Sequence, residues 1–151
     1  MAARPTFPAG LALDAHKQQA CGTPIVDLPM PAQVVLALDQ GTGYSAEPVV
    51  TVGEAVAAGT LVARAGHPYA SAVHSPLAGI VAAIEPRAAA VPGGHSACIV
   101  IDGNGSDRID DSVRPVADPA ALSPEELVQR LRDAGIAGLA GAGFPAATDG
   151  N

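Results

Sequence analysis

The sequence predicts a mainly β protein with an extended N-terminal arm and one helix near its C-terminal end. Gly and Pro, at 17 and 14 residues, make up about a fifth of the 151 residues. That share is high for a helical bundle and is typical of short strands joined by tight turns. The apolar runs are also short, and two of them, 34–38 and 80–84, span five residues each. Hydrophobic residues reach 48%, enough for a core, although only 3% of the chain is aromatic.

Residues 1–32 are predicted to form an extended arm. Proline lacks a backbone donor and fixes φ, so a proline-rich segment resists both helix and sheet. We expect this arm to lie on the surface of something larger. Its prolines are Pro5, Pro8, Pro24, Pro29 and Pro31.

Residues 33–103 are predicted to form a compact β module. An apolar run at 34–38 is its first strand, and Gly53 and Gly59 begin turns flanked by β-branched residues. Residues 72–84 echo this pattern weakly, with a glycine just before a Val-rich strand. A further strand is expected at 97–101. Gly53 and Gly59 would both destabilise a helix over their stretch of the chain.

Residues 104–122 are polar and contain Pro115 and Pro119, so they are predicted to be a linker. The carboxylates on the turns and in this stretch are expected to be solvated rather than part of a metal or acid–base site. They are Asp102, Asp107, Asp110, Asp111 and Asp118.

A helix is predicted after Ser123. Ser123 is a good N-cap, Pro124 suits the first helical position, and Glu126 completes a capping box. Gly135 is a suitable stop. One face of the helix is apolar, and we expect it to be exposed or loosely packed; it carries Leu127, Val128, Leu131 and Ala134.

A glycine-rich loop follows the helix, and its candidate cofactor-binding residues are Gly138, Gly141, Gly143 and Phe144. Successive glycines let backbone N–H groups converge on an anion or let a flat ring approach the main chain. A flexible tail is the alternative. A helix followed by such a loop typically opens an α/β domain, so 123–151 is interpreted as the start of a nucleotide-binding domain that the sequence does not continue. No catalytic residue is assigned.

Composition excludes several functions. The formal net charge is −7 and Lys17 is the only lysine, so no basic face for nucleic acid can be assembled. No apolar run approaches the roughly twenty residues of a membrane-spanning helix, and no signal peptide is recognised. Cys21 and Cys98 alone make no zinc or cluster site, and reduced thiols are expected.

His67 and His74 leave a phosphotransfer function open. One imidazole could act as a nucleophile with the other as its support. Two ordinary turn histidines are the alternative, since nothing near them in the sequence supplies an orienting acid.

The paired Val-x-Val-Gly and Ser-Pro-x-x-Gly-x-Val patterns are similar to those of biotinyl and lipoyl carrier domains. A carrier needs a lysine on an exposed hairpin, and the corresponding stretch, Arg64–Ala70, has none. We therefore predict the fold of those domains, a barrel-sandwich hybrid, without the carrier function.

An ordered series of motifs over residues 6–147 resembles the N-terminal part of RnfC, one of the proteins of the Rnf-type electron transport complex. The series includes Thr6–Leu11, Leu28–Pro31, Ala46–Val50, Ala72–Ser75, Ile84–Arg87, Leu122–Leu127 and Gly141–Pro145. The resemblance implies a peripheral subunit on the cytoplasmic side of the bacterial inner membrane, with the other subunits of that complex as partners. The complex couples electron flow between ferredoxin and NAD to ion translocation.

The resemblance also implies cofactors for the whole subunit: FMN and NADH in a domain opened by the Gly-Ala-Gly-Phe-Pro loop, and two 4Fe-4S clusters in a ferredoxin-like tail. This sequence departs from the pattern. Ala140 stands where the family usually has glycine, no lysine follows Pro145, and the cluster cysteines are absent. We expect the chain alone to bind none of these cofactors, to be catalytically silent, and to serve assembly or docking. A non-redox adaptor that recruits a partner through its arm stays open beside the phosphotransfer function.

Overall fold

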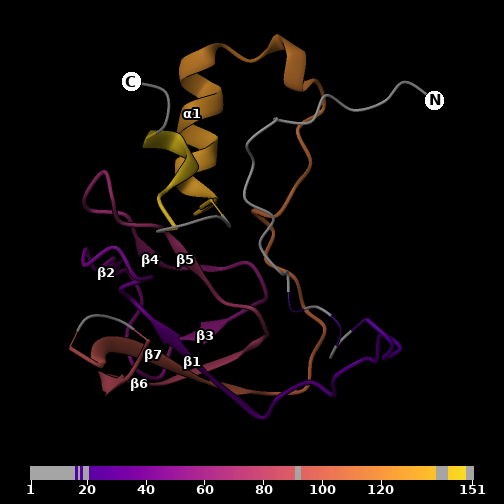
Figure 1. The fold of residues 1–151 in the computed structure, drawn as a ribbon, viewed down its shortest axis with the longest axis vertical. Helices are drawn as coiled ribbons and strands as arrows, with labels where there is room; N and C mark the ends of the chain where they lie inside the picture. The colour runs from indigo at the N-terminus through magenta and orange to yellow at the C-terminus, as the bar shows by residue number, and fades with distance from the viewer. Residues whose placement is uncertain (1–15, 17, 19–20, 91–92, 139–142, 149–151) are drawn as a thin grey trace.

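The computed structural model describes residues 16, 18, 21–90, 93–138 and 143–148. A module of short strands occupies one end of the molecule, and the helix α1 stands at the other end (Figure 1). The strands are β1 (Gln33–Ala37), β2 (Glu47–Pro48), β3 (Ala55–Val56), β4 (Leu61–Arg64), β5 (Val73–His74), β6 (Gly79–Ala88) and β7 (His95–Gly103). The helices are α1 (Pro124–Asp133) and two 3₁₀ turns, η2 (Pro119–Ala121) and η3 (Ala146–Thr148).

The strands form two antiparallel sheets. One has the order β1-β7-β6-β3 and the other the order β2-β4-β5. In the first, Val34 of β1 pairs with Ile101 of β7, and Ile84 of β6 pairs with Ile99. The register between β6 and β7 shifts between Val81 and Ala83, which marks a bulge in this long hairpin.

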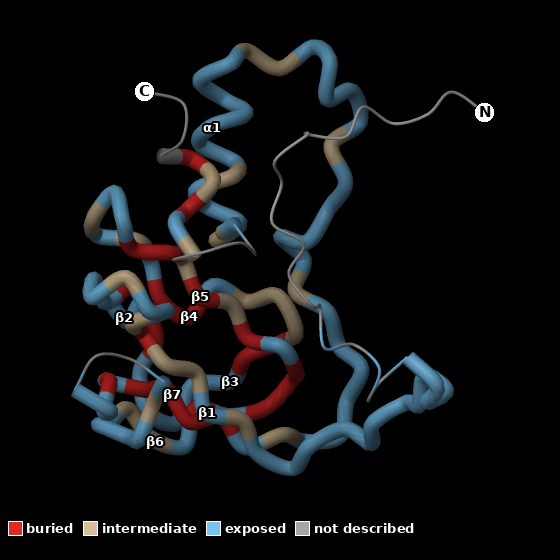
Figure 2. The backbone as a smooth tube through the Cα atoms, in the orientation of Figure 1, coloured by how far each residue is buried: buried red, intermediate tan, exposed pale blue. Residues whose placement is uncertain are grey.

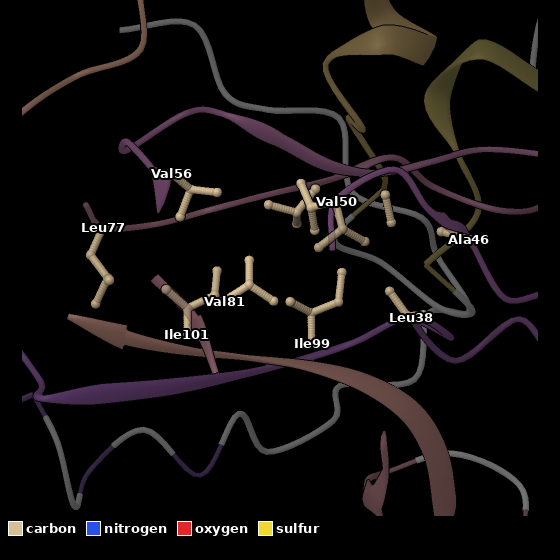
Figure 3. Packing of buried hydrophobic residues seen from close by; sticks show 11 residues of the cluster. Leu38, Ala46, Val50, Val56, Leu77, Val81, Ile99 and Ile101 are labelled. Atoms are coloured by element: carbon tan, nitrogen blue, oxygen red, sulfur yellow. The ribbon is translucent and has the colours of Figure 1, made fainter. Parts of the chain in front are cut away.

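The core lies between the two sheets and is built from aliphatic side chains. Figure 3 shows Ile99 and Ile101 of β7 facing Val50 and Val56 across it, with Leu38 at one end. Ile99 and Ile101 are fully buried. The second sheet contributes residues of β4 and β5, so both sheets supply the core. The members from β4 and β5 are Val62, Ala63 and Val73, and the remaining members are Ala46, Leu77 and Val81.

Glycine is required at two turns that the sequence singled out. Gly53 and Gly59 have φ values of 89° and 90°, the left-handed region that suits glycine. The Gly53 N–H donates to Val81 of β6, and the Gly59 N–H donates to Ser75 next to β5. Each turn thus ties its strand to the second segment of the weak internal repeat.

The predicted strands are confirmed, and two of them are longer than predicted. β6 continues to Ala88 rather than ending near Ile84, and β7 begins at His95 rather than Ala97. The two extensions pair with one another, from Glu85–Cys98 to Ala88–His95. A partner strand so close in the chain lets polar residues continue the ladder, which an apolar pattern does not reveal.

Part of the segment predicted as a linker lies on the module. The Ala58 N–H donates to Arg108, and the Asp110 N–H donates back to Ala58, forming a short parallel bridge. The Asp110 carboxylate accepts a hydrogen bond of 2.5 Å from Thr60. The Asp110 carboxylate is therefore hydrogen-bonded to the module, whereas the sequence predicted a solvated carboxylate.

The described part of the arm is consistent with an extended segment. Residues 21–32 are exposed, and 24–31 contain no helix or strand. Ile25 and Leu28 are 101% and 87% exposed. The arm meets the module at its end, where the Gly103 N–H donates to Ala32 at 2.8 Å.

Candidate functional site

The predicted helix begins and ends as its sequence requires. The Ser123 side chain accepts from the Glu126 N–H, and the Glu126 side chain accepts from the Ser123 N–H, which completes the capping box. At the other end Gly135 adopts a φ of 65° and donates to Arg132, while Ile136 donates to Leu131. These two bonds form a Schellman motif that satisfies carbonyls of the last turn.

Gly135 also fixes where the helix meets the module. A Cβ at this position would lie 2.2 Å from the carbonyl oxygen of Ala72, just before β5. Only a glycine allows the two backbones to approach so closely. The C-terminal end of α1 thus lies against the second sheet, and the glycine-rich loop starts there.

The described ends of the glycine-rich loop are paired with one another. The Gly138 N–H donates to Phe144 at 2.9 Å, and the Ala146 N–H donates to Ile136 at 2.8 Å. A bridge between Ala137 and Pro145 lies between these bonds. The structure therefore brings the predicted residues Gly138, Gly143 and Phe144 to one place, while Gly141 lies outside the described residues.

An aromatic cluster joins the module to this loop. The rings of Tyr44 and His67 stack with centroids 3.8 Å apart and an interplanar angle of 2°. Tyr69 lies against both, and its ring meets Phe144 edge-on at 5.5 Å. Tyr44, Tyr69 and Phe144 are each between 43% and 46% exposed. No role for Tyr44 or Tyr69 was predicted from the sequence; the scarcity of aromatic residues was the one signal that could have linked them.

A cavity of about 360 Å³ lies beside this cluster, between the end of α1 and the module. Its walls come from Gln40, residues 71–74, the helix end at 134–135, and Ala137 and Gly143. Ser71 is only 7% exposed, and its hydroxyl oxygen has no hydrogen-bond partner in the described structure. The cavity thus unites a predicted loop residue, a predicted histidine and a polar group that was not predicted from the sequence.

Burial lowers the pKa of His74 below its ordinary value of 6.5, and the nearby carboxylates of Asp110 and Asp133 act in the opposite direction. The imidazole is therefore mostly neutral at pH 7. Hydrogen bonds from Ser112 and Thr60 lower the pKa of Asp110 to about 2, so this group stays ionised.

The two histidines of the phosphotransfer hypothesis lie in different surroundings. His67 stacks on Tyr44, and its Nδ1 accepts from the Tyr69 N–H at 3.2 Å. His74 instead lines the cavity with two carboxylates near it. Anionic neighbours disfavour a phosphate on His74, so the geometry does not favour this hypothesis.

The described residues contain no group of three His, Cys, Asp or Glu side chains that could hold a metal ion. None of their helices is long and apolar enough to cross a membrane. Both cysteines are free, with Cys21 exposed and Cys98 buried in β7.

Comparison with known proteins places this geometry in a family. The family model described as the RnfC barrel sandwich hybrid domain matches residues 5–106. The chain belongs to this RnfC family. The barrel-sandwich hybrid predicted from the paired glycine patterns is thus confirmed, as is the resemblance to the Rnf-type protein.

Curated relatives are named as the RnfC component of an ion-translocating oxidoreductase complex. The chain is 38% identical to the protein of Pseudomonas aeruginosa over 97% of the chain and 19% of the relative. It is 38% identical to that of Serratia proteamaculans over 94% of the chain and 20% of the relative. For Vibrio cholerae the identity is 35%, over 93% and 18%. The chain thus spans about a fifth of the length of these RnfC proteins.

Proposed function

We propose that the chain acts as the N-terminal part of a subunit of a complex that couples electron transfer between ferredoxin and NAD to ion translocation. Its own role is assembly and docking, at the cytoplasmic face of the bacterial inner membrane, with the other subunits as partners. Membership of the RnfC family supports the assignment of the chain to such a complex. The observation that carries the docking role is the uncovered apolar face of the helix α1.

The described residues do not make a complete site for FMN or NADH. Gly138, Gly143 and Phe144 supply one glycine-lined edge. The cavity beside them has no Lys or Arg among its lining residues to meet a phosphate, and carboxylates lie near its His74. A dinucleotide or FMN would meet repulsion there. We therefore propose that the chain alone binds neither FMN nor NADH, nor the two 4Fe-4S clusters of the family, and derive no redox step for it.

The helix α1 offers the docking face. None of its residues is buried, as Figure 2 shows, and Leu127 and Val128 are 42% and 36% exposed. An amphipathic helix is stabilised by packing of its apolar face. An uncovered apolar face on an ordered helix therefore favours a partner that covers it.

The test is co-purification of the tagged 151-residue chain with the other subunits of the complex, co-expressed. Replacing Leu127 and Val128 by Ser should reduce recovery of those subunits several-fold. Gln129→Ser is the matched control, because at about 100° per residue Gln129 lies on the opposite face of α1. Recovery that is equal for both variants would refute docking through this face.

A second candidate function, a non-redox adaptor, is favoured by the exposed apolar residues of the arm, Ile25, Leu28 and Met30. It predicts that deletion of residues 123–151 leaves partner binding intact. The docking role predicts that the same deletion abolishes binding.

A further inference from the structure

The Ser71 hydroxyl is a buried polar group that the fold leaves unsatisfied. Its residue is 7% exposed, and the oxygen faces no donor or acceptor in the part of the chain that is described. Such a group costs free energy unless a ligand or an ordered water completes it. Ser71 lines the cavity of about 360 Å³, a volume at the lower end of ligand sites. The unsatisfied hydroxyl therefore points to an occupant of this cavity.

The surroundings of the cavity are electronegative. Ala134 and Gly135 line it, so the C-terminal end of α1 places its negative dipole end there. Asp110 and Asp133 both lie near enough to His74 to act on it electrostatically. Neither these carboxylates nor Arg130 and Arg132 of the last turn of α1 line the cavity, but only the carboxylates act on His74. Arg108 lies near Asp110 and offsets part of that charge.

The polar groups of the wall can accept hydrogen bonds. Ser71 offers a hydroxyl oxygen, and a neutral imidazole such as His74 offers one ring nitrogen. An occupant that only donates hydrogen bonds and carries positive charge complements this set. A phosphate or carboxylate does not, because it would meet acceptors and carboxylates.

The aromatic cluster beside the cavity favours a planar cation on a polypeptide. Tyr69 precedes the lining segment 71–74, and Phe144 follows the lining residue Gly143. Exposed aromatic faces attract guanidinium groups more often than ammonium groups. The same helix carries the exposed residues Leu127 and Val128 about two turns before the cavity, so an occupant that also covers them must be a polypeptide.

We propose that this cavity receives the guanidinium group of an arginine side chain from a partner protein. The group donates to Ser71 Oγ, and Asp133 and Asp110 offset its charge from beside the cavity. The neutral His74 forms one wall. The recognition of the guanidinium group does not depend on which complex the partner protein belongs to.

The test uses two probes that differ only in charge and donor pattern, N-acetyl-arginine amide and N-acetyl-citrulline amide. The 151-residue chain is titrated with each, and the carbon-bound ring protons of His74 are followed by NMR after assignment with His74→Asn. The arginine probe should shift these signals saturably, and the citrulline probe should bind about tenfold more weakly. Equal binding of the two probes, or no saturable shift with either, would overturn the proposal.

Two variants locate the site. Asp133→Asn should weaken the arginine probe several-fold, whereas Asp111→Asn makes the same change in net charge at a residue that is not one of the two carboxylates acting on His74 and should not. Ser71→Ala should keep the fold and also weaken binding. Unchanged affinity in both Asp133→Asn and Ser71→Ala would show that the probe binds elsewhere and that water alone satisfies the hydroxyl.

Discussion

At the residue scale, Gly79 shows how closely the two longest strands approach each other. A Cβ added there would lie 2.1 Å from the carbonyl oxygen of Asp102. Gly79 stands at the start of β6 and pairs with Gly103 of β7. Any larger residue must therefore push apart the hairpin that carries Ile99 and Ile101 into the core.

We expect Gly79→Ala to lower the free energy of unfolding by roughly 2–4 kcal/mol, because overpacking costs about 1–3 kcal/mol and shifts a ladder bond as well. Urea unfolding measures this change. Gly105→Ala is the matched control: its φ is 72° and its Cβ meets nothing within 4 Å, so the expected loss is only about 1 kcal/mol of backbone strain. Equal losses in both variants would contradict a steric cause at Gly79.

His74 gives the stability of the module a defined dependence on pH. Burial holds its pKa below 6.5 in the folded state, so the unfolded chain binds the proton more tightly. Stability should therefore be unaffected well above pH 6.5 and should fall as the pH drops from about 7 toward the folded pKa. In His74→Asn this slope should be smaller in urea unfolding measured at several pH values. An unchanged slope in the variant would assign the pH effect to other groups.

At the scale of elements, the sequence was most informative where the signal is local. The helix was predictable because Ser123, Glu126 and Gly135 fix its ends within one turn of chain. The hairpin of β6 and β7 was predictable in outline because part of each strand is an apolar run. The docking of residues 108–113 was not predictable, because the bridge to Ala58 depends on backbone groups and not on side-chain pattern.

Asp110 is the side chain that holds this docked segment. Asp110→Asn removes the ionised acceptor of bonds from Thr60 and Ser112, so the melting temperature at neutral pH should fall. Since the pKa of Asp110 is lowered to about 2, its contribution is complete above its ordinary value of 3.8 and is lost as the pH falls through about 2.

The difference in melting temperature between the wild type and Asp110→Asn should therefore shrink as the pH is lowered toward about 2. Asp107→Asn, at an exposed position of the same segment, should leave the melting temperature nearly unchanged. A constant difference at all pH values would contradict an electrostatic origin.

At the scale of the whole molecule, the candidate site was predictable only in part. Gly138, Gly143 and Phe144 were identified from the glycine-rich pattern after the helix, and the structure brings them together. The residues that the module contributes to the site were not predictable, since Tyr69 meets Tyr44 and Phe144 only after distant turns have folded. Long-range contacts of this kind leave no periodic signal in a single sequence.

The contact between Tyr69 and Phe144 is the side-chain link that we expect to couple module and loop. A double-mutant cycle with Tyr69→Ala and Phe144→Ala should give a coupling free energy of about 0.5–1.5 kcal/mol, the range for edge-on aromatic pairs. The measurement is hydrogen exchange of the Gly138 amide, which donates to Phe144 and therefore reports the closed loop.

The exchange of the Ile101 amide in β7 is the control, because the module should stay folded in both variants. Faster exchange at Gly138 with Ile101 unchanged would show that the module orders the loop through its aromatic cluster. Additive effects of the two substitutions would instead assign that order to the Gly135 contact with Ala72.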